Sequence, residues 1–184
     1  MTNVTDASPL TAYFLPADKL AATASLAALI ASAAELWFSV YEFCDAPTTT
    51  NLKAARAKGI PVHIYADASM SKRPTQHQTL VGLVAAGCEV TIGGSVAGAN
   101  FINHTKSIVA RLPHSSPQAL PSCWEGSFNF DAMAYMEENT ILLFASKLWA
   151  DAFVANFNAC VTNAWAKQKS LQIALAQPQP SVLP

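Results

Sequence analysis

The segment "LWFSVYEFCDAPTTTNLKAARAKGIPVHIYAD", residues 36–67, decides the fold class. It opens with a run of apolar and aromatic residues, Leu36–Phe43, which is short enough to be a buried strand. The next segment, Thr48–Gly59, begins with threonines and ends with glycine, residues that are typical of the two ends of a helix. A second apolar run, Ile60–Asp67, predicts another strand. This order of strand, helix and strand indicates a βαβ unit.

The same alternation continues on both sides of this unit. An Ala- and Leu-rich helix is expected before it, and a further helix and strand after it. Beyond Gly98 the pattern predicts a strand, a Pro- and Ser-rich loop, a compact turn, a last strand and a long helix. The corresponding residues are 18–34, 76–87, 88–94, 103–111, 112–124, 125–130, 140–145 and 147–169. The sequence therefore predicts an α/β fold with a central mixed, mostly parallel sheet sandwiched between helices.

Length and composition indicate one domain. The chain has 184 residues, of which 52% are hydrophobic and 12% charged, and its formal net charge is −1. This near-neutral balance gives no sign of a nucleic-acid binder, and so little charge predicts that a second subunit covers part of the surface. We expect a single domain at residues 19–170, an N-terminal extension at 1–18 and a Pro-rich tail at 171–184.

No segment has the pattern of a transmembrane helix, because Glu35 and Glu42 interrupt the most apolar stretch. The N-terminus lacks the basic and apolar regions of a secretory signal, so we expect a cytoplasmic protein, or a periplasmic or secreted one if a signal has been removed. The four cysteines are widely spaced, without a CxxC pair. This spacing favours reduced, mostly buried thiols over a zinc site or a disulfide framework.

The stretch "NHTKSIVAR", residues 103–111, places a histidine and a lysine two residues apart. In a strand, side chains alternate between the two faces, so the pair would share one face. A cation beside an imidazole needs an anion over it, either a carboxylate from elsewhere in the chain or a phosphate from a substrate. The two predicted faces are His104, Lys106, Ile108 and Ala110 on one side and Thr105, Ser107, Val109 and Arg111 on the other.

Three motifs in this order, "HTK" at 104–106, "GSFN" at 126–129 and "EEN" at 137–139, resemble those of the phospholipase D superfamily. Two further elements, Ala55–Ile64 and Leu83–Val90, resemble the short bacterial endonuclease branch with a single motif. The resemblance covers roughly residues 20–167 and implies a metal-independent phosphodiesterase. Within that class it favours a non-specific endonuclease that forms a phosphohistidine.

The resemblance also implies roles for the basic pair. The neutral imidazole of His104 would attack phosphorus, and Lys106 would supply a point charge for the phosphate. A carboxylate behind the imidazole would hold its orientation. By the family pattern that carboxylate is Glu138, and the adjacent Glu137 remains a competitor.

The GSFN turn would complete the phosphate site. Ser127 and Asn129 would supply neutral donors, and Gly126 would let the backbone come close. This scheme requires no metal and no cofactor.

The chemistry needs two imidazoles, because one attacks phosphorus while the other protonates the leaving group. The chain carries one His-x-Lys motif and no internal repeat, and none of the other histidines is followed by x-Lys. We therefore expect a symmetric homodimer with one composite site, in which two copies of His104 meet. The other histidines are His63, His77 and His114.

One departure from the family pattern is Arg111, which stands where the family has an aspartate, and the loop at 112–124 is longer than usual. By strand parity Arg111 faces away from His104, and Glu125 or Asp131 are candidate substitutes for the missing acid. Two alternatives stay open: a phospholipase D acting on phospholipid head groups, and a catalytically degenerate binding protein. A nucleic-acid substrate predicts strong salt dependence, whereas a lipid substrate predicts an exposed apolar entrance.

Overall fold

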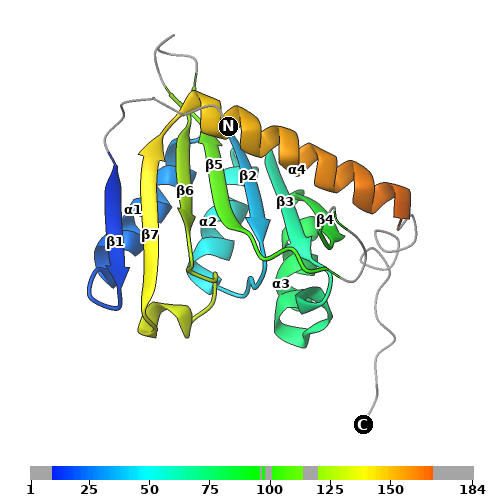
Figure 1. The fold of residues 1–184 in the computed structure, drawn as a ribbon, viewed down its shortest axis with the longest axis horizontal. Coiled ribbons are helices and arrows are strands. Elements are labelled where there is room, and N and C mark those ends of the chain that lie inside the picture. Colours follow the sequence, from blue (N-terminus) through cyan, green and yellow to red (C-terminus); the bar gives the residue numbers. More distant parts are fainter. Residues whose placement is uncertain (1–9, 96, 98–100, 114–119, 168–184) are drawn as a thin grey trace.

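The computed structural model describes residues 10–95, 97, 101–113 and 120–167. They form one seven-stranded sheet in the order β1-β7-β6-β5-β2-β3-β4, with helices on both faces (Figure 1). The strands are β1 (Thr11–Leu15), β2 (Glu35–Val40), β3 (Val62–Asp67), β4 (Glu89–Gly93), β5 (Lys106–Arg111), β6 (Ser122–Gly126) and β7 (Asn139–Ala145).

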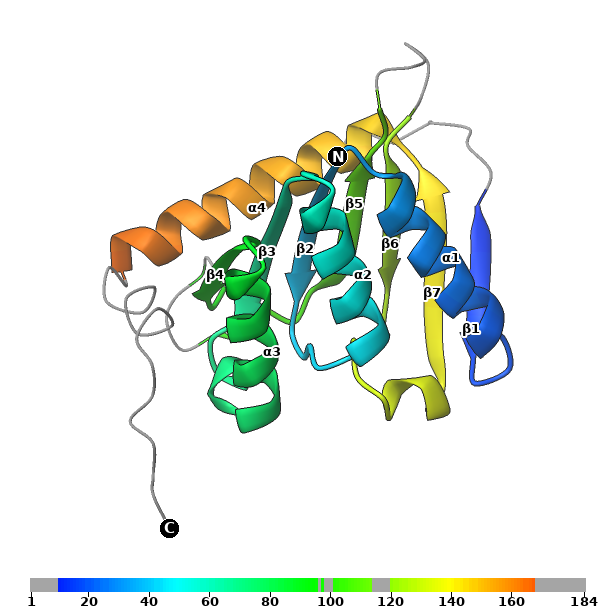
Figure 2. The ribbon, with the colours of Figure 1, turned by 180° about the vertical axis from the view of Figure 1, so that it is seen from behind.

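Three helices cover one face of the sheet and a fourth crosses the other. Figure 2 shows α1 (Lys19–Ser32), α2 (Ala46–Ala57) and α3 (Pro74–Ala85) side by side in front of the strands. On the opposite face lies α4 (Lys147–Lys167), which runs obliquely across the strands (Figure 1). In the described part of the chain, no helix is both long and apolar enough to cross a membrane. The predicted α/β fold, with a mixed sheet between helices, is confirmed.

The sheet is mixed, as expected, but the expected majority of parallel pairings is wrong, because most of the described pairings are antiparallel. Among the described strands, β2–β3 and β3–β4 pair in parallel, whereas β1–β7, β7–β6, β6–β5 and β5–β2 are antiparallel. The described residues that connect β5, β6 and β7 contain no crossover α-helix, and antiparallel neighbours do not need one. Strand β6 itself begins inside the stretch 112–124 that the sequence assigns to a loop.

Residues 11–15 fall in the segment that the sequence assigns to an N-terminal extension, yet they form the edge strand β1. This strand pairs with β7 along its whole length. Its sequence, TAYFL, is short and runs directly into Pro16, so nothing in its pattern marks it as part of the sheet. The domain therefore includes residues before 19, while the predicted tail, 171–184, lies outside the described residues.

Capping residues explain where the helices next to the site begin and end. Helix α2 starts two residues earlier than expected, because the side chain of Asp45, rather than a threonine, accepts the backbone N–H of Thr48 at 2.9 Å. The residue after its C-cap, Gly59, has φ of +83°, a conformation that glycine adopts without strain. The expected glycine stop is therefore present.

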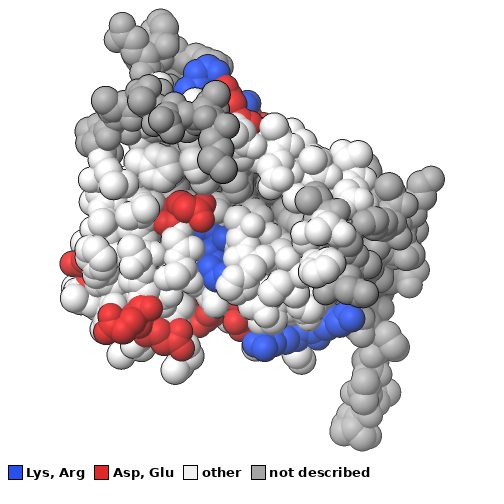
Figure 3. Space-filling model, viewed as in Figure 1, with Lys and Arg blue, Asp and Glu red and all other residues white. Residues whose placement is uncertain are grey.

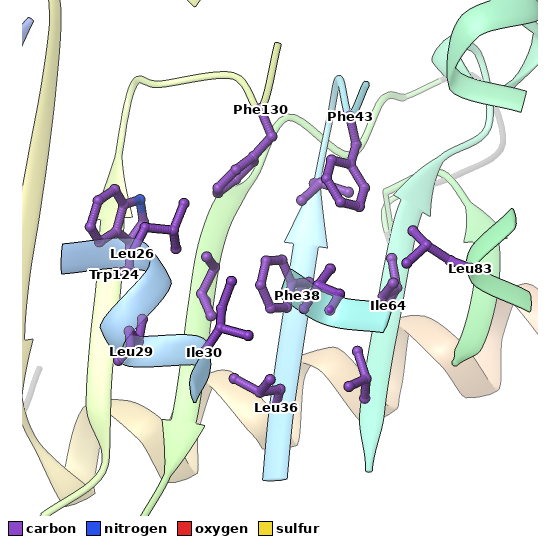
Figure 4. Close-up of a cluster of buried hydrophobic side chains, with 14 of the residues drawn as sticks. Leu26, Leu29, Ile30, Leu36, Phe38, Phe43, Ile64, Leu83, Trp124 and Phe130 are labelled. Carbon is purple, nitrogen blue, oxygen red and sulfur yellow. The ribbon is translucent and has the colours of Figure 1, made fainter. Parts of the chain in front are cut away.

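The main core lies between the sheet and helices α1–α3. Figure 4 shows Leu26, Leu29 and Ile30 of α1 beside Trp124 of β6 and Phe38 of β2. Alternate side chains of the strands point to the other face, where a smaller cluster packs under α4. That cluster includes Trp37, Tyr65, Val109, Cys123 and Phe157.

Two leucines of α1 offer a matched test of this packing. Leu26 is 2% exposed and Leu20 is 85% exposed. We expect Leu26→Ala to lower the free energy of unfolding by about 2–5 kcal/mol, because it leaves a cavity. Leu20→Ala should change it by no more than about 0.5 kcal/mol. Urea denaturation of both variants measures the difference, and equal losses would contradict the described orientation of α1.

Candidate functional site

The basic pair, His104 and Lys106, lies at the edge of the sheet where β5 begins and where β2 and β3 end. Strand β5 runs antiparallel to β2, so its first residue, Lys106, stands opposite Val40, the last residue of β2. Because β2 and β3 are parallel, the end of β3 at Asp67 is at the same edge of the sheet. His104 precedes β5 by two residues and is exposed. The site therefore occupies the carboxyl edge of the parallel strands, where α/β sheets commonly bind ligands.

The histidine and the lysine meet on one aromatic ring. The imidazole of His104 lies 4.7 Å from the ring of Tyr41, centroid to centroid, at an interplanar angle of 60°. The Nζ of Lys106 lies 5.2 Å from the same ring centroid and donates a hydrogen bond to the carbonyl of His104 at 2.8 Å. A cation over the face of an aromatic ring is attracted by its quadrupole. Tyr41 thus holds both groups in one place.

The predicted alternation of faces does not extend to His104. Strand β5 begins only at Lys106, and the residues before it are outside the ladder. Further along the strand the alternation holds, because Ile108 belongs to the core under α1–α3 and Val109 to the cluster under α4. The basic pair is therefore brought together by contacts around Tyr41 and not by strand parity alone.

Of the two anions that the sequence left open, a carboxylate acts on the lysine within the chain. Lys106 is 5% exposed, and its burial lowers its pKa, while the nearby Glu125 acts in the opposite direction. Burial also raises the pKa of Glu125, and hydrogen bonds from Ser107 and from the backbone of Gly126 oppose that rise. Glu125 stands opposite Ser107 in the β5–β6 pairing. The negative charge that acts on the ammonium group thus comes from β6.

The GSFN turn has two faces. Phe128 is in the core, while Ser127 is exposed and Asn129 partly exposed. The hydroxyl of Ser127 donates to Oδ1 of Asn139 at 2.9 Å and accepts the N–H of Thr140 at 3.1 Å. The hydroxyl therefore also fixes the turn to β7.

Two residues of this turn carry further information. A Cβ at Gly126 would lie 2.1 Å from the carbonyl oxygen of Thr140, so close packing of β6 on β7 requires glycine here. Glycine is therefore needed here for packing between strands, whereas the sequence predicted that it lets the backbone approach a phosphate. The buried Oδ1 of Asn129 has no hydrogen-bond partner among the described residues. This oxygen is an acceptor, so only the amide nitrogen of Asn129 is suited to a phosphate.

Within one chain, the predicted carboxylate and the histidine form no hydrogen bond or ion pair in the part that the structure describes. Glu138 and Glu137 are exposed in the segment that enters β7. Among the described residues, neither carboxylate forms a recorded hydrogen bond or ion pair with His104. The choice between the two glutamates stays a prediction.

Arg111 lies at the far end of β5 from the site. A strand of six residues places it about 17 Å from Lys106. Its guanidinium lies over the ring of Trp37, 4.6 Å from the centroid, and pairs with Glu35 at 3.5 Å. The replacement of the family's aspartate therefore does not touch the basic pair. Residues 114–119 of the long loop lie outside the described residues.

Asp131, a candidate for the missing acid, and His63 both make contacts that stabilise the fold. Asp131 accepts the backbone N–H groups of Met133 and Ala134 and so caps a short 3-10 helix, η2 (Ala134–Met136). His63 bonds to Glu89 at 2.7 Å and to Glu35 at 3.1 Å at the opposite end of the sheet. It borders a cavity of about 630 Å³ between β4, α3 and α4, remote from Lys106. No group of three metal-ligating side chains occurs in the described ranges.

Charge is unevenly distributed over the face that carries α4 (Figure 3). Acidic side chains gather at the lower left, over the connection between β6 and β7, which contains the exposed Glu137 and Glu138. Basic side chains gather at the lower right, near η1 (Met70–Lys72), where Arg73 is also exposed. Arg73 pairs with Glu42 at 3.1 Å, which links this basic group to the strand end beside Tyr41.

The sequence reasoning missed three residues of this edge: Tyr41, Asp67 and Asn103. Asp67 ends a predicted strand and Tyr41 lies two residues before the end of another, near the positions where ligands bind in such sheets, so the strand ends were the available signal. Asn103 precedes the His-x-Lys motif directly. Its burial and its bonds to two strands depend on the tertiary structure.

Known structures with the same fold cover most of the chain. Nuc from Salmonella typhimurium, a phospholipase D family member, matches with a TM-score of 0.71 and 18% identity over 85% of this chain and 95% of its own. NucT from Helicobacter pylori matches with a TM-score of 0.69 and 19% identity, over 84% and 98%. Polyphosphate kinase from Porphyromonas gingivalis gives 0.61 and 13%, over 96% of this chain and 27% of its own.

The amino-acid sequence was compared with curated proteins and with protein families. No curated protein sequence matches the chain significantly. The family described as cardiolipin synthase, phospholipase D-like domain, matches residues 26–161, which include all three motifs. With the fold and the His-x-Lys pair at the edge of the sheet, this match places the chain in the phospholipase D-like domain family.

Proposed function

We propose that this protein is a metal-independent phosphodiesterase in which His104 forms a phosphohistidine. One observation carries the proposal: an exposed imidazole and a buried ammonium group share the ring of Tyr41 at the edge of the sheet. An exposed imidazole can reach phosphorus, and an ammonium group with three donors has two left for phosphoryl oxygens after its bond to the carbonyl of His104.

The reaction proceeds in two displacements. In the first, an imidazole nitrogen of His104 forms a bond to phosphorus, the bond from phosphorus to the leaving oxygen breaks, and a second imidazolium gives that oxygen its proton. In the second, water attacks phosphorus, the bond to His104 breaks, and the second imidazole, now neutral, takes the proton of the water. Lys106 stabilises the charge on the phosphoryl oxygens in both steps.

The second imidazole comes from a second copy of the chain. Of the other histidines in the described ranges, His63 is held by two glutamates at the far end of the sheet, and His77 lies within α3. A two-fold axis beside His104 would place the equivalent imidazole opposite it. Glu138, exposed and without a recorded bond to its own His104, is then available to orient an imidazole in the dimer.

Nucleic acid is the first substrate class to test. The exposed Lys72 and Arg73 follow the end of β3, at the same edge of the sheet as His104, and cations of this kind bind phosphates along a backbone. A phospholipid is the second class, because Phe101 and Ile102, directly before the site, are 61% and 47% exposed. Such apolar side chains suit the acyl region of a lipid surface.

Removal of the imidazole tests the nucleophile. We expect His104→Ala to lower the rate of phosphodiester hydrolysis by at least about 10²–10⁴-fold, because no other group replaces the attacking nitrogen. The assay uses plasmid DNA and phosphatidylcholine vesicles in parallel, both in EDTA, with His77→Ala as the matched control. DNA cleavage supports a nuclease and choline release a phospholipase D. Activity that persists in His104→Ala, or that EDTA abolishes, would sink the mechanism.

Dilution tests the composite site. A dimer that assembles the site should lose specific activity as the concentration falls below its dissociation constant, because monomers hold one imidazole each. Analytical ultracentrifugation over the same concentrations gives the dimer fraction, and we expect the two curves to coincide. Constant specific activity in a fully monomeric sample would contradict the two-imidazole scheme.

The carboxylate beside Lys106 predicts a change in the pH profile. Burial lowers the pKa of Lys106 and Glu125 raises it, so removal of that negative charge lowers the pKa further. We therefore expect Glu125→Gln to move the alkaline limb of the kcat/KM profile to lower pH, since the ammonium group is lost earlier. Glu89→Gln, at an exposed carboxylate beside His63 at the opposite end of the sheet, is the control for the loss of one charge. A shift toward higher pH would refute the assignment of this limb to Lys106.

A further inference from the structure

The backbone that carries His104 is held by side chains instead of by the sheet. Residues 101–105 precede β5 and form no strand. At the end of β3, Asp67 is 1% exposed, and its Oδ2 accepts the backbone N–H of Asn103 at 2.8 Å. A hydrogen bond to a buried charge is stronger than one between neutral groups. This bond fixes the backbone nitrogen of Asn103, the residue directly before His104.

The side chain of Asn103 adds bonds to both neighbouring strands. It is buried, and its Nδ2 donates to Oγ of Ser39 at 3.2 Å and to the carbonyl of Val40 at 3.3 Å. The same nitrogen lies 3.5 Å from the carbonyl of Tyr65 on β3. Its Oδ1 accepts the N–H of Thr105 at 3.3 Å. Asn103 therefore fixes the chain on both sides of the histidine.

The other oxygen of Asp67 holds the neighbouring element of the site. Its Oδ1 accepts the backbone N–H groups of Ser69 and Met70 at 2.9 and 3.0 Å, where η1 begins. One buried carboxylate thus joins the end of β3, the start of η1 and the segment of His104. A buried charge without such donors would be costly, so the three N–H groups and the carboxylate stabilise one arrangement.

We propose that Asp67 and Asn103 are positioning residues that fix the imidazole of His104 against Tyr41. Neither residue needs to contact the substrate, because both act through the backbone of residues 103–105. The inference rests on the proposed role of His104 in hydrolysis. A misplacement of a reacting group by about 1 Å costs on the order of 100-fold in rate, so small shifts of this segment have large effects.

The experiment compares Asn103→Ala and Asp67→Asn with the wild type by NMR and kinetics. In the wild type, a nuclear Overhauser effect should connect the rings of His104 and Tyr41, whose centroids are 4.7 Å apart. Both variants should lose this signal and show kcat reduced by about 10- to 100-fold, with KM nearly unchanged. Leu26→Ala, in the core under α1, is the control for a general loss of stability and should keep both the signal and kcat.

The outcomes separate this inference from the proposed function. Retention of the ring contact and of kcat in both variants would overturn the positioning role, and so would an equal loss in Leu26→Ala. If the wild type shows no hydrolysis that depends on His104, the proposed function is refuted. If the two variants nevertheless lose the contact between the rings of His104 and Tyr41, the positioning role of Asp67 and Asn103 is still supported. If Asp67→Asn or Asn103→Ala does not fold, Ser39→Ala removes one bond of the same network and gives the same readouts.

Discussion

The antiparallel pairing of β5 with β2 is the constraint on which the site depends. Its register sets Lys106 opposite Val40, so the first residue of β5 meets the last residue of β2. A slip of one residue would turn every side chain of β5 to the other face and move Ile108 out of the core under α1–α3. Burial of β5 on both faces therefore locks the position of the basic pair.

The two basic groups of the site differ in their exposure to solvent. The ammonium group of Lys106 is buried against Tyr41, and the negative charge of the partly exposed Glu125 opposes the fall of its pKa. The imidazole of His104 is exposed above it. This arrangement explains why a lysine can occupy an otherwise apolar strand.

The elements that the sequence predicted well are those with a strong local pattern. The βαβ segment at residues 36–67 and the next helix and strand appear as β2, α2, β3, α3 and β4, with ends shifted by a few residues. The sequence missed β1, which lies in the predicted N-terminal extension, and β6, which begins in the predicted loop. Both form strands by pairing with β7. Strands that pair with distant segments leave no local sequence pattern of that pairing. For this reason the sequence did not predict which neighbouring strands run antiparallel.

By itself the sequence determined the fold class, the family motifs and the proximity of His104 to Lys106, because neighbouring residues stay together in any fold. The tertiary structure decided which groups from distant segments surround them. Tyr41, Asp67 and Glu125 reach the pair only because β2, β3 and β6 end beside β5. The bond between Ser127 and Asn139 likewise joins the GSFN turn to the start of β7. Contacts of this kind depend on strand order and register, which hydrophobic periodicity does not encode.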